Sequence, residues 1–252
     1  MDAQIERAAE AIARADYLCV TTGAGMSADS GLPVFAALSN HPAMQQRGLT
    51  YDQIASPDRL VKDPALFYGF WLSCRQRYQS TAPHAGYSAV ARWINQLNSR
   101  DNTAPGAASR AFVVTSNVDG FMQRAGVPDG VVAQIHGDCV GRWQCGGEPN
   151  REPPHFPLFT RDGCGALFEP ALDEISVDAD ALAAAPRAGT GWPQCPRCGG
   201  AARPHVYLFG DGSRFRNDPA VTKQEAWAAW RERVLAALRA EVPTRIANPP
   251  PG

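Results

Sequence analysis

The sequence predicts an α/β fold in which an open, doubly wound parallel sheet carries a small cysteine-rich insertion. Three apolar runs, at residues 17–22, 111–115 and 131–135, have the length and composition of buried parallel strands. Helical patterns lie between these runs, so strands and helices alternate along the chain. From residue 139 to 203 the periodicity fades into a stretch rich in Cys, Gly and Pro, which is typical of a small module held by a metal ion.

Apolar residues recur at helical spacing in four segments outside the strands. In the first of them, Ile5, Ala8, Ala9 and Ile12 share one face. Two others separate the first strand from the second, which gives the alternating order of a doubly wound sheet. We expect helices at about residues 3–14, 64–79, 85–98 and 222–240.

Composition excludes several classes of protein. Of the 252 residues, 44% are apolar and 19% are charged, which allows one or two packed globular domains. Since 24 basic residues face 25 acidic ones, no net field recruits nucleic acid or an anionic membrane. The N-terminal segment is charged and helical, and no apolar run reaches the length of a membrane span. We therefore expect a cytoplasmic protein whose cysteines are reduced and serve as core residues or metal ligands.

A glycine motif follows the first predicted strand. Gly23, Gly25 and Ala28 match the G-x-G-x-x-G/A pattern, in which backbone N–H groups approach a pyrophosphate at the start of a helix. A glycine-rich turn without any ligand fits this short pattern equally well. The stretch Ser30-Gly31-Leu32-Pro33 should end the helix soon after it starts. An ordinary dehydrogenase would continue that helix, so the motif points to a different kind of site.

Three further motifs follow in order: TSNVD at 115–119, QIHGD at 134–138, and CPRCGG at 195–200 with RPHVYLFGD at 203–211. The second of the four motifs continues as GFMQRAG at 120–126. Together with the glycine loop, these motifs resemble those of the sirtuin family of NAD-dependent protein deacylases, over about residues 5–211.

The resemblance implies a chemistry in which NAD is consumed. In this family the acyl oxygen of a modified lysine attacks the ribose carbon of NAD as nicotinamide leaves, and a histidine then acts as general base on a ribose hydroxyl. His136 is the matching position, and imidazole suits proton transfer near neutral pH. Asn117 and Asp119 match residues that hold nicotinamide and its ribose. A lone histidine is more often hydrogen-bonded at a strand end, but the motif that flanks His136 reverses that preference. Asn117 and Asp119 also suit a turn after the strand, a role that is compatible with binding.

The same resemblance implies two sets of binding residues. Residues that match the substrate segment of the family pair by backbone with an acylated-lysine peptide, as an added strand; a core strand is the alternative. These residues are Val206, Leu208, Phe209 and Gly210. The residues that match the NAD site are Gly23, Ala24, Gly25, Ser27, Phe35, Ser116, Asn117, Asp119 and His136.

The cysteines indicate a structural zinc site. Cys195-x-x-Cys198 has the spacing of a zinc knuckle. The family usually has a second close pair, whereas here Glu148 stands at that spacing after Cys145, and the next cysteine is Cys164. Interpreting residues 148–163 as an insertion makes Cys145, Cys164, Cys195 and Cys198 the ligand set. Cys139 is the main competitor, while Cys19 and Cys74 are expected to be small core residues.

The chain departs from the family pattern in three places: after the proline of the glycine loop, at Ser116, where glutamine is usual, and in the segment that follows Asp211. Val34-Phe35-Ala36 stands where the family has Asp-Phe-Arg, so an arginine that engages NAD is replaced. Family members that remove acidic acyl groups carry Tyr-x-x-Arg, but Tyr68 is followed by Trp71 at that spacing. An acidic acyl group is therefore not favoured. After Asp211 the chain has one helical pattern and a Pro-rich end, so we expect it to be shorter than the family and to lack strands that hold the adenosine half of NAD.

We therefore predict a Rossmann-like doubly wound domain from residues 1–138 and 204–252, with a small zinc-binding module at 139–203. The expected function is NAD-dependent deacetylation or deacylation of lysine side chains in a protein or peptide. Two alternatives remain at this point: an ADP-ribosyltransferase of the same fold, and a zinc-stapled protein that binds NAD or peptide with little turnover. No nucleic-acid or membrane partner is expected.

Overall fold

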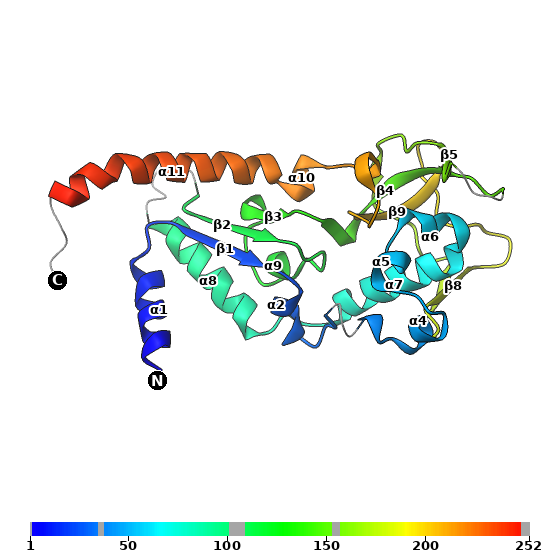
Figure 1. The fold of residues 1–252 in the computed structure, drawn as a ribbon, viewed down its shortest axis with the longest axis horizontal. Coiled ribbons are helices and arrows are strands. Elements are labelled where there is room, and N and C mark those ends of the chain that lie inside the picture. The colour runs from blue at the N-terminus through cyan, green and yellow to red at the C-terminus, as the bar shows by residue number, and fades with distance from the viewer. Residues whose placement is uncertain (1, 35–37, 101–108, 153–156, 248–252) are drawn as a thin grey trace.

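The computed structural model describes residues 2–34, 38–100, 109–152 and 157–247. It forms an elongated molecule with a parallel sheet at one end and a cysteine-containing module at the other (Figure 1). The chain begins in helix α1 (Ala3–Arg14), beside the parallel sheet, and α11 (Gln224–Ala247) runs along the sheet and past it.

The three predicted strands form one parallel sheet. They are β1 (Leu18–Thr22), β2 (Ala111–Thr115) and β3 (Val132–Gln134), in the order β1-β2-β3. In register, Leu18 pairs with Ala111, and Val113 with Val132. The sequence prediction of these strands is confirmed to within one or two residues at each end.

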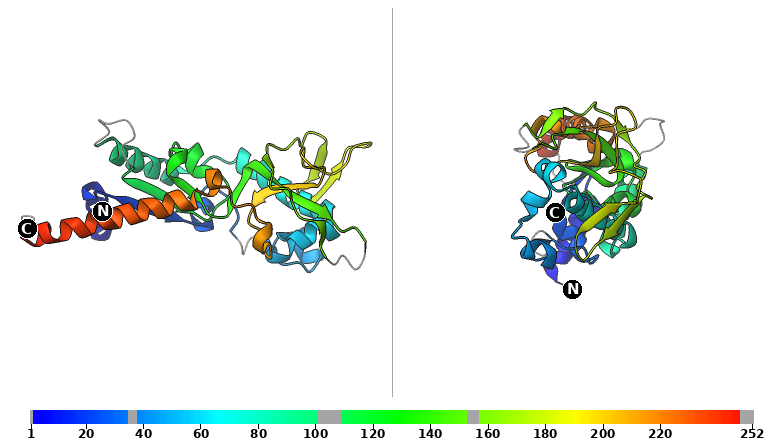
Figure 2. Two further views of the ribbon diagram at one scale, coloured as in Figure 1. Left: turned by 90° about the horizontal axis from the view of Figure 1, so that it is seen from above. Right: turned by 90° about the vertical axis from the view of Figure 1, so that its right-hand side faces the viewer.

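Helices cover both faces of this sheet. Because successive side chains of a strand point to opposite faces, Ala111 and Val113 pack on α8 (Ala85–Ser99) and α9 (Phe121–Arg124), whereas Phe112 packs on α11. The two faces bury separate clusters, one around Ile94 and the other around Trp230. The sheet is therefore doubly wound, as predicted (Figure 2).

Cys19 is not a core residue, contrary to the sequence prediction. It is exposed on β1, where it pairs in register with Phe112 and so shares the face of the sheet that α11 covers. The buried residues against which α11 packs lie on β2 and β3, among them Ala133. Cys19 therefore lies on the correct face but beyond the reach of the helix.

The second part of the molecule combines short helices with antiparallel strands. The long strand β4 pairs with β5, β6 and β9, and β7 pairs with β8 as a separate hairpin. The strands are β4 (Gly137–Pro149), β5 (Phe159–Arg161), β6 (Leu167–Phe168), β7 (Ile175–Asp178), β8 (Ala183–Pro186) and β9 (Ala201–Val206). The helices are α4 (Pro42–Gln46), α5 (Tyr51–Ile54), α6 (Pro57–Lys62) and α7 (Pro64–Ser80).

One core joins these helices to these strands. Phe67 and Tyr68 of α7 belong to the same buried cluster as Trp143 and Ala202 of β4 and β9. Helices α4–α7 thus pack with the cysteine-containing strands rather than on the parallel sheet. The predicted boundaries of the two domains stay a prediction. Helices α4–α7, which lie before the end of α7 at Ser80, contribute to the core of the second part of the molecule.

The remaining elements are short. They are α2 (Ala24–Ala28), η1 (Asp129–Val131), η2 (Gly212–Arg214) and α10 (Pro219–Thr222). Over the part of the chain that the structure describes, no helix combines the length and the apolar character needed to cross a membrane.

Candidate functional site

The carboxyl ends of the three parallel strands open onto one cavity of about 340 Å³. Ser116 follows β2, and His136 lies two residues after β3. The opposite wall comes from the second part of the molecule, with Trp71 of α7 and Leu208 after β9. We call this space the site cavity. It lies between the two parts, which is a common location for a ligand site.

The glycine loop lies along one side of the site cavity. Helix α2 ends at Ala28, close to the predicted break, and Gly31 then adopts a left-handed conformation with φ +88°. Ala24 and Ser27 line the cavity. Gly23 lies against the neighbouring loop, because a Cβ at this position would be 3.3 Å from Ser116 Oγ.

A buried hydrogen-bond network joins the predicted polar residues. Asn117 Nδ2 donates to the Gly23 carbonyl at 3.0 Å and to Ser27 Oγ at 2.9 Å. Ser27 Oγ donates to Asp119 Oδ2 at 2.6 Å and lies 2.8 Å from the Tyr87 hydroxyl. The network holds the glycine loop against the loop after β2, so the two predicted motifs form one constellation.

Burial perturbs the acid–base properties of this network. Burial raises the pKa of Asp119, and hydrogen bonds from Ser27 Oγ and the Phe121 N–H oppose the rise. Burial also raises the pKa of Tyr87 to about 12, with the hydrogen bond to Ser27 acting against it. Perturbed groups beside a cavity are a feature of functional sites.

Sequence reasoning did not identify Tyr87. It is 1% exposed and lies on the apolar face of α8, where a core role accounts for it from periodicity alone. Only its hydroxyl contact with Ser27 reveals that it supports the site.

His136 lies at the junction of the two parts of the molecule. Its side chain is exposed and lines the site cavity. The His136 carbonyl accepts a hydrogen bond from the Tyr207 N–H at 2.9 Å. Gly137 then turns the chain with φ +87°, and a Cβ there would lie 2.0 Å from the His205 carbonyl. Glycine is therefore required next to the histidine for β4 to approach β9.

The predicted substrate segment forms the rim of the site cavity. Val206 and Leu208 are buried, Phe209 is 49% exposed, and Gly210 is exposed with φ +79°. The Phe209 N–H donates to the Ala55 carbonyl at 3.0 Å. All four residues line the cavity.

A buried ion pair holds this rim in place. Arg203 Nη2 lies 2.8 Å from Asp211 Oδ2, and both side chains are at most 2% exposed. The same Asp211 oxygen accepts the Leu208 N–H at 3.0 Å, and the Asp211 N–H donates to the Leu208 carbonyl. Strand β9 is thus linked directly to the rim segment.

The predicted loop around Phe35 lies outside the described residues, and so does Ala36. The other residues assigned to NAD from the sequence lie together around the glycine loop and the ends of β2 and β3. Gly25 is exposed there, and a Cβ on it would meet nothing within 4 Å.

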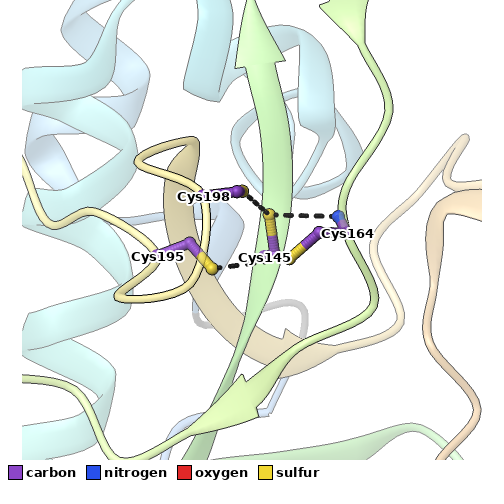
Figure 3. Close-up of side chains that lie close together, drawn as sticks. All are labelled: Cys145, Cys164, Cys195 and Cys198. Atoms are coloured by element: carbon purple, nitrogen blue, oxygen red, sulfur yellow. Dashed lines mark hydrogen bonds between the residues drawn. The ribbon is translucent and has the colours of Figure 1, made fainter.

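The structure brings together the four cysteines predicted as metal ligands. Their sulfur atoms all lie within 4.8 Å of one another. Cys145 is on β4, Cys164 lies between β5 and β6, and Cys195 and Cys198 are on the loop before β9 (Figure 3). The competitor Cys139 is 1% exposed, and its sulfur faces the Trp71 carbonyl at 3.9 Å instead.

The cysteine cluster fits a zinc ion. Cys145 and Cys198 sulfurs are 3.5 Å apart, and those of Cys164 and Cys195 are 3.7 Å apart. Tetrahedral zinc with Zn–S bonds of about 2.3 Å separates its ligands by about 3.8 Å. Hydrogen bonds from the Gly200 N–H and from the Cys145 thiol lower the pKa of Cys198 to about 7, whereas burial raises the pKa values of Cys145 and Cys195. Metal binding to this cluster therefore has to release protons from the buried thiols.

Tyr68 does not lie in the site cavity. It is fully buried, donates to the Ala202 carbonyl at 2.7 Å, and stacks between Trp143 and Trp192. Tyr68 is therefore a core residue, and its side chain does not border the space where an acyl group would lie. The acyl group has to be judged from the cavity itself.

Comparison with known proteins supports the resemblance. The mitochondrial NAD-dependent protein deacylase sirtuin-5 of Danio rerio is 29% identical over 207 residues, which cover 80% of this chain and 59% of the relative. NAD-dependent protein deacylase 2 of Pseudomonas aeruginosa is 29% identical over 206 residues, which cover 81% of this chain and 65% of the relative. The chain thus spans less than two thirds of the length of these relatives.

A solved structure has the same fold. The crystal structure of a Sir2 homolog–NAD complex matches with a TM-score of 0.54 at 24% identity, over 81% of this chain and 62% of that one. The model of the Sir2 family matches residues 23–229, a range that includes the glycine loop, the network after β2, His136, the four cysteines and the rim segment. The chain therefore belongs to the Sir2 family.

Proposed function

We propose that this protein is an NAD-dependent protein deacylase that transfers the acyl group of a modified lysine side chain to the ADP-ribose part of NAD and releases nicotinamide. One observation carries the proposal: the Ser27–Asn117–Asp119 network and His136 face the same cavity as the rim segment 206–210. A polar half suited to a ribose and a carboxamide thus adjoins an apolar half suited to an acyl-lysine. Membership of the Sir2 family and the similarity to NAD-dependent protein deacylases support the same function.

The polar half has the donors and acceptors that nicotinamide ribose requires. Asn117 offers an amide with both a donor and an acceptor, and Asp119 offers a carboxylate beside it. Their positions are held by Ser27, which contacts both side chains. In the proposed reaction these residues orient NAD, a consumed substrate.

His136 is the proposed general base. Its ring lines the cavity from the end of β3 and lies 6.3 Å from the Tyr207 ring, measured between centroids. A neutral imidazole at this position can accept the proton of a ribose hydroxyl. The His136 carbonyl accepts a hydrogen bond from the Tyr207 N–H. This bond holds His136 and the rim segment in a fixed position relative to each other.

The cysteine cluster has a structural role in this proposal. Bound zinc supplies no reaction step and holds β4 against the loop before β9, since Cys145 lies on one and Cys195 and Cys198 on the other. That pairing sets the position of β9 and of the rim that follows it.

We further propose that the protein acts in the cytoplasm on acylated proteins or peptides, without nucleic-acid or membrane partners. The balance of 24 basic and 25 acidic residues supports the second part. Four thiols in one metal cluster suit a reducing compartment.

Nicotinamide release from NAD tests the proposed activity. We expect release that depends on an acylated-lysine peptide and is absent with the unmodified peptide. His136→Ala should lower kcat/KM by about a hundredfold or more, the usual effect of losing a general base, while thermal unfolding and zinc content stay unchanged.

Two results contradict the proposal. Full activity of His136→Ala would remove the general base from the scheme. Nicotinamide release that is independent of the acyl group, with ADP-ribose found on protein, would favour the transferase alternative.

A further inference from the structure

We propose that two copies of this protein pair through the open edge of β1 and form a single sheet that contains the parallel strands of both copies. The inference is independent of the proposed deacylase activity. It is carried by the burial of β1 and by the direction in which its backbone groups point.

The burial of β1 differs from that of its neighbours. Of the three described strands of the parallel sheet, β3 is buried throughout and β2 at all but one residue. In β1, Cys19 and Thr21 are exposed and the other residues are half-buried. Its sequence, Leu-Cys-Val-Thr-Thr, is nevertheless typical of a buried strand. The strand therefore lacks the cover that its composition favours.

The two edges of the sheet also differ. At one edge, β3 is three residues long and packs against α10 and α11. At the other edge, β1 is five residues long, and β2 is its one partner among the described strands. It contains no proline, glycine or charged side chain, and its register with β2 is uninterrupted. Proteins use such features to prevent an edge strand from pairing, so the edge of β1 is free to pair.

The backbone of β1 presents its free groups in a symmetric pattern. The Leu18 N–H donates to the Arg110 carbonyl in the ladder with β2. Because the backbone groups of successive residues in a strand point to opposite sides, every second residue from Leu18 to Thr22 faces β2. The N–H and carbonyl groups of Cys19 and Thr21 therefore face the open edge.

A two-fold axis at Val20 pairs all of these groups. In an antiparallel arrangement centred there, Cys19 lies opposite Thr21 of the second copy, and each donates its N–H to the carbonyl of the other. The symmetric pair does the same. The two Val20 side chains meet between these pairs, on the face of the sheet that α8 covers, where a β-branched cross-strand pair is stabilising. The edge is therefore complementary to itself, which favours a second copy as its partner.

Apolar surface continues from this edge onto two helices. Helix α1 has no buried residue, and Ile5 on its apolar face is 57% exposed. A cavity of about 230 Å³ between α1 and α8 is lined by Ile12, Leu18 and Trp93, and Trp93 is 38% exposed. Because Leu18 also belongs to β1, the apolar surface reaches the edge. A stable dimer buries more area than one strand edge supplies, and this surface can supply the rest.

Sedimentation equilibrium of the full chain tests the proposal. We expect a concentration-dependent dimer, with a mass twice that of the chain. Thr21→Pro should weaken dimerisation at least about tenfold, because proline removes the N–H that each copy donates across the edge. That N–H faces away from β2, and edge strands tolerate proline, so the zinc content and the far-UV circular dichroism should stay unchanged. Thr21→Ser is the matched control, since it keeps the N–H and should dimerise like the parent protein.

Engineered cysteines locate the axis. The exposed Cys19 is first replaced by serine. In that background, Val20→Cys should form a disulfide between copies under mild oxidation, because residues directly opposite in a non-hydrogen-bonded pair lie close enough for this bond. Leu18→Cys is the matched control. Position 18 is half-buried on the same face of β1, but its two thiols would lie about 13 Å apart along the strands and should stay reduced.

Three results overturn the proposal: a parent protein that is monomeric at every concentration, an unchanged dimer in Thr21→Pro, or a disulfide that forms as readily from Leu18→Cys as from Val20→Cys. A monomer would leave the edge to a strand of a different chain. If Thr21→Pro does not fold, the two cysteine variants decide, because both keep the backbone donors of β1. Nicotinamide release enters none of these measurements, so the dimer and the deacylase activity can fail separately.

Discussion

At the scale of single residues, the buried carboxyl group of Asp119 illustrates how a site residue can lower the stability of the folded protein. The residue is 6% exposed, and its carboxyl group accepts hydrogen bonds from Ser27 Oγ and from the Phe121 N–H. Burial nevertheless raises its pKa, so the folded state disfavours the ionised form. A group with a raised pKa stabilises the fold below its unfolded pKa, and this contribution is lost as the pH rises through the folded value.

Asp119→Asn should therefore stabilise the protein and inactivate it. The amide keeps an acceptor for the Phe121 N–H and removes the buried charge. We expect its Tm at pH 7 to rise, by about 2–4 °C for each 1 kcal/mol gained in a protein of this size, and the gain to shrink toward pH 4. Nicotinamide release should fall. Calorimetry across this pH range measures the effect, and a variant that is less stable at pH 7 than at pH 4 relative to the parent contradicts it.

At the scale of elements, β4 connects the metal cluster to the site. The strand starts at Gly137, next to His136, and carries Cys145 further along. It pairs with β9, whose last residue, Val206, opens the rim segment. Order in the metal cluster therefore supports the position of the rim through backbone pairing.

Cys195→Ser should remove the metal and loosen this part of the molecule. A four-thiolate site loses most of its affinity with one ligand gone, and zinc binding supplies local folding free energy. Elemental analysis should find about one zinc per chain in the parent protein and almost none in the variant. Cys139→Ser is the matched control, because Cys139 is buried on the same strand as Cys145 but outside the cluster. Zinc lost in Cys139→Ser and kept in Cys164→Ser would show that the ligand set is wrong.

At the scale of the whole molecule, α11 covers one face of the parallel sheet. Trp230 is 5% exposed, packs on Phe112, and donates from Nε1 to the Ser109 carbonyl at 2.8 Å. This contact joins α11 to β2, the central strand of the parallel sheet. The face of the sheet that α11 covers depends on a small set of large side chains.

Trp230→Ala should destabilise the protein by about 3–5 kcal/mol, the range for truncating a buried aromatic side chain. Leu238→Ala on the same helix should change stability by less than about 0.5 kcal/mol, since Leu238 is 39% exposed. Urea unfolding of both variants measures the difference. Similar values for the two would mean that α11 does not pack on the sheet in solution.

Much of the fold followed from local patterns in the sequence. Uninterrupted apolar runs predicted β1, β2 and β3, and 3.6-residue periodicity predicted α1, α7, α8 and α11, because both signals depend only on neighbouring residues. The Cys-x-x-Cys pair and the His136-Gly137 pair were likewise recognisable as motifs. The four-cysteine set followed from the family resemblance, with the segment 148–163 interpreted as an insertion and Cys139 left as a competitor.

Other features depend on contacts between residues far apart in the chain. Cys19 stands within an apolar run of the sequence, which is typical of a core strand. Whether it is buried depends on whether α11 packs against β1. Tyr87 resembles any apolar helix residue until its hydroxyl meets Ser27. Comparison with the Tyr-x-x-Arg pattern predicted that Tyr68 lies near the acyl group. Its hydroxyl instead donates to the Ala202 carbonyl, and the side chain lies in the core.

The sequence by itself thus determined the three parallel strands, the helices with clear periodicity and the family, and it predicted the residues of the site. The tertiary structure alone decided which side of each element is covered and that α4–α7 join the cysteine-containing core. The physical reason is that periodicity reports which face of an element is apolar, whereas the partner of that face is set by packing among distant segments, which no local pattern encodes.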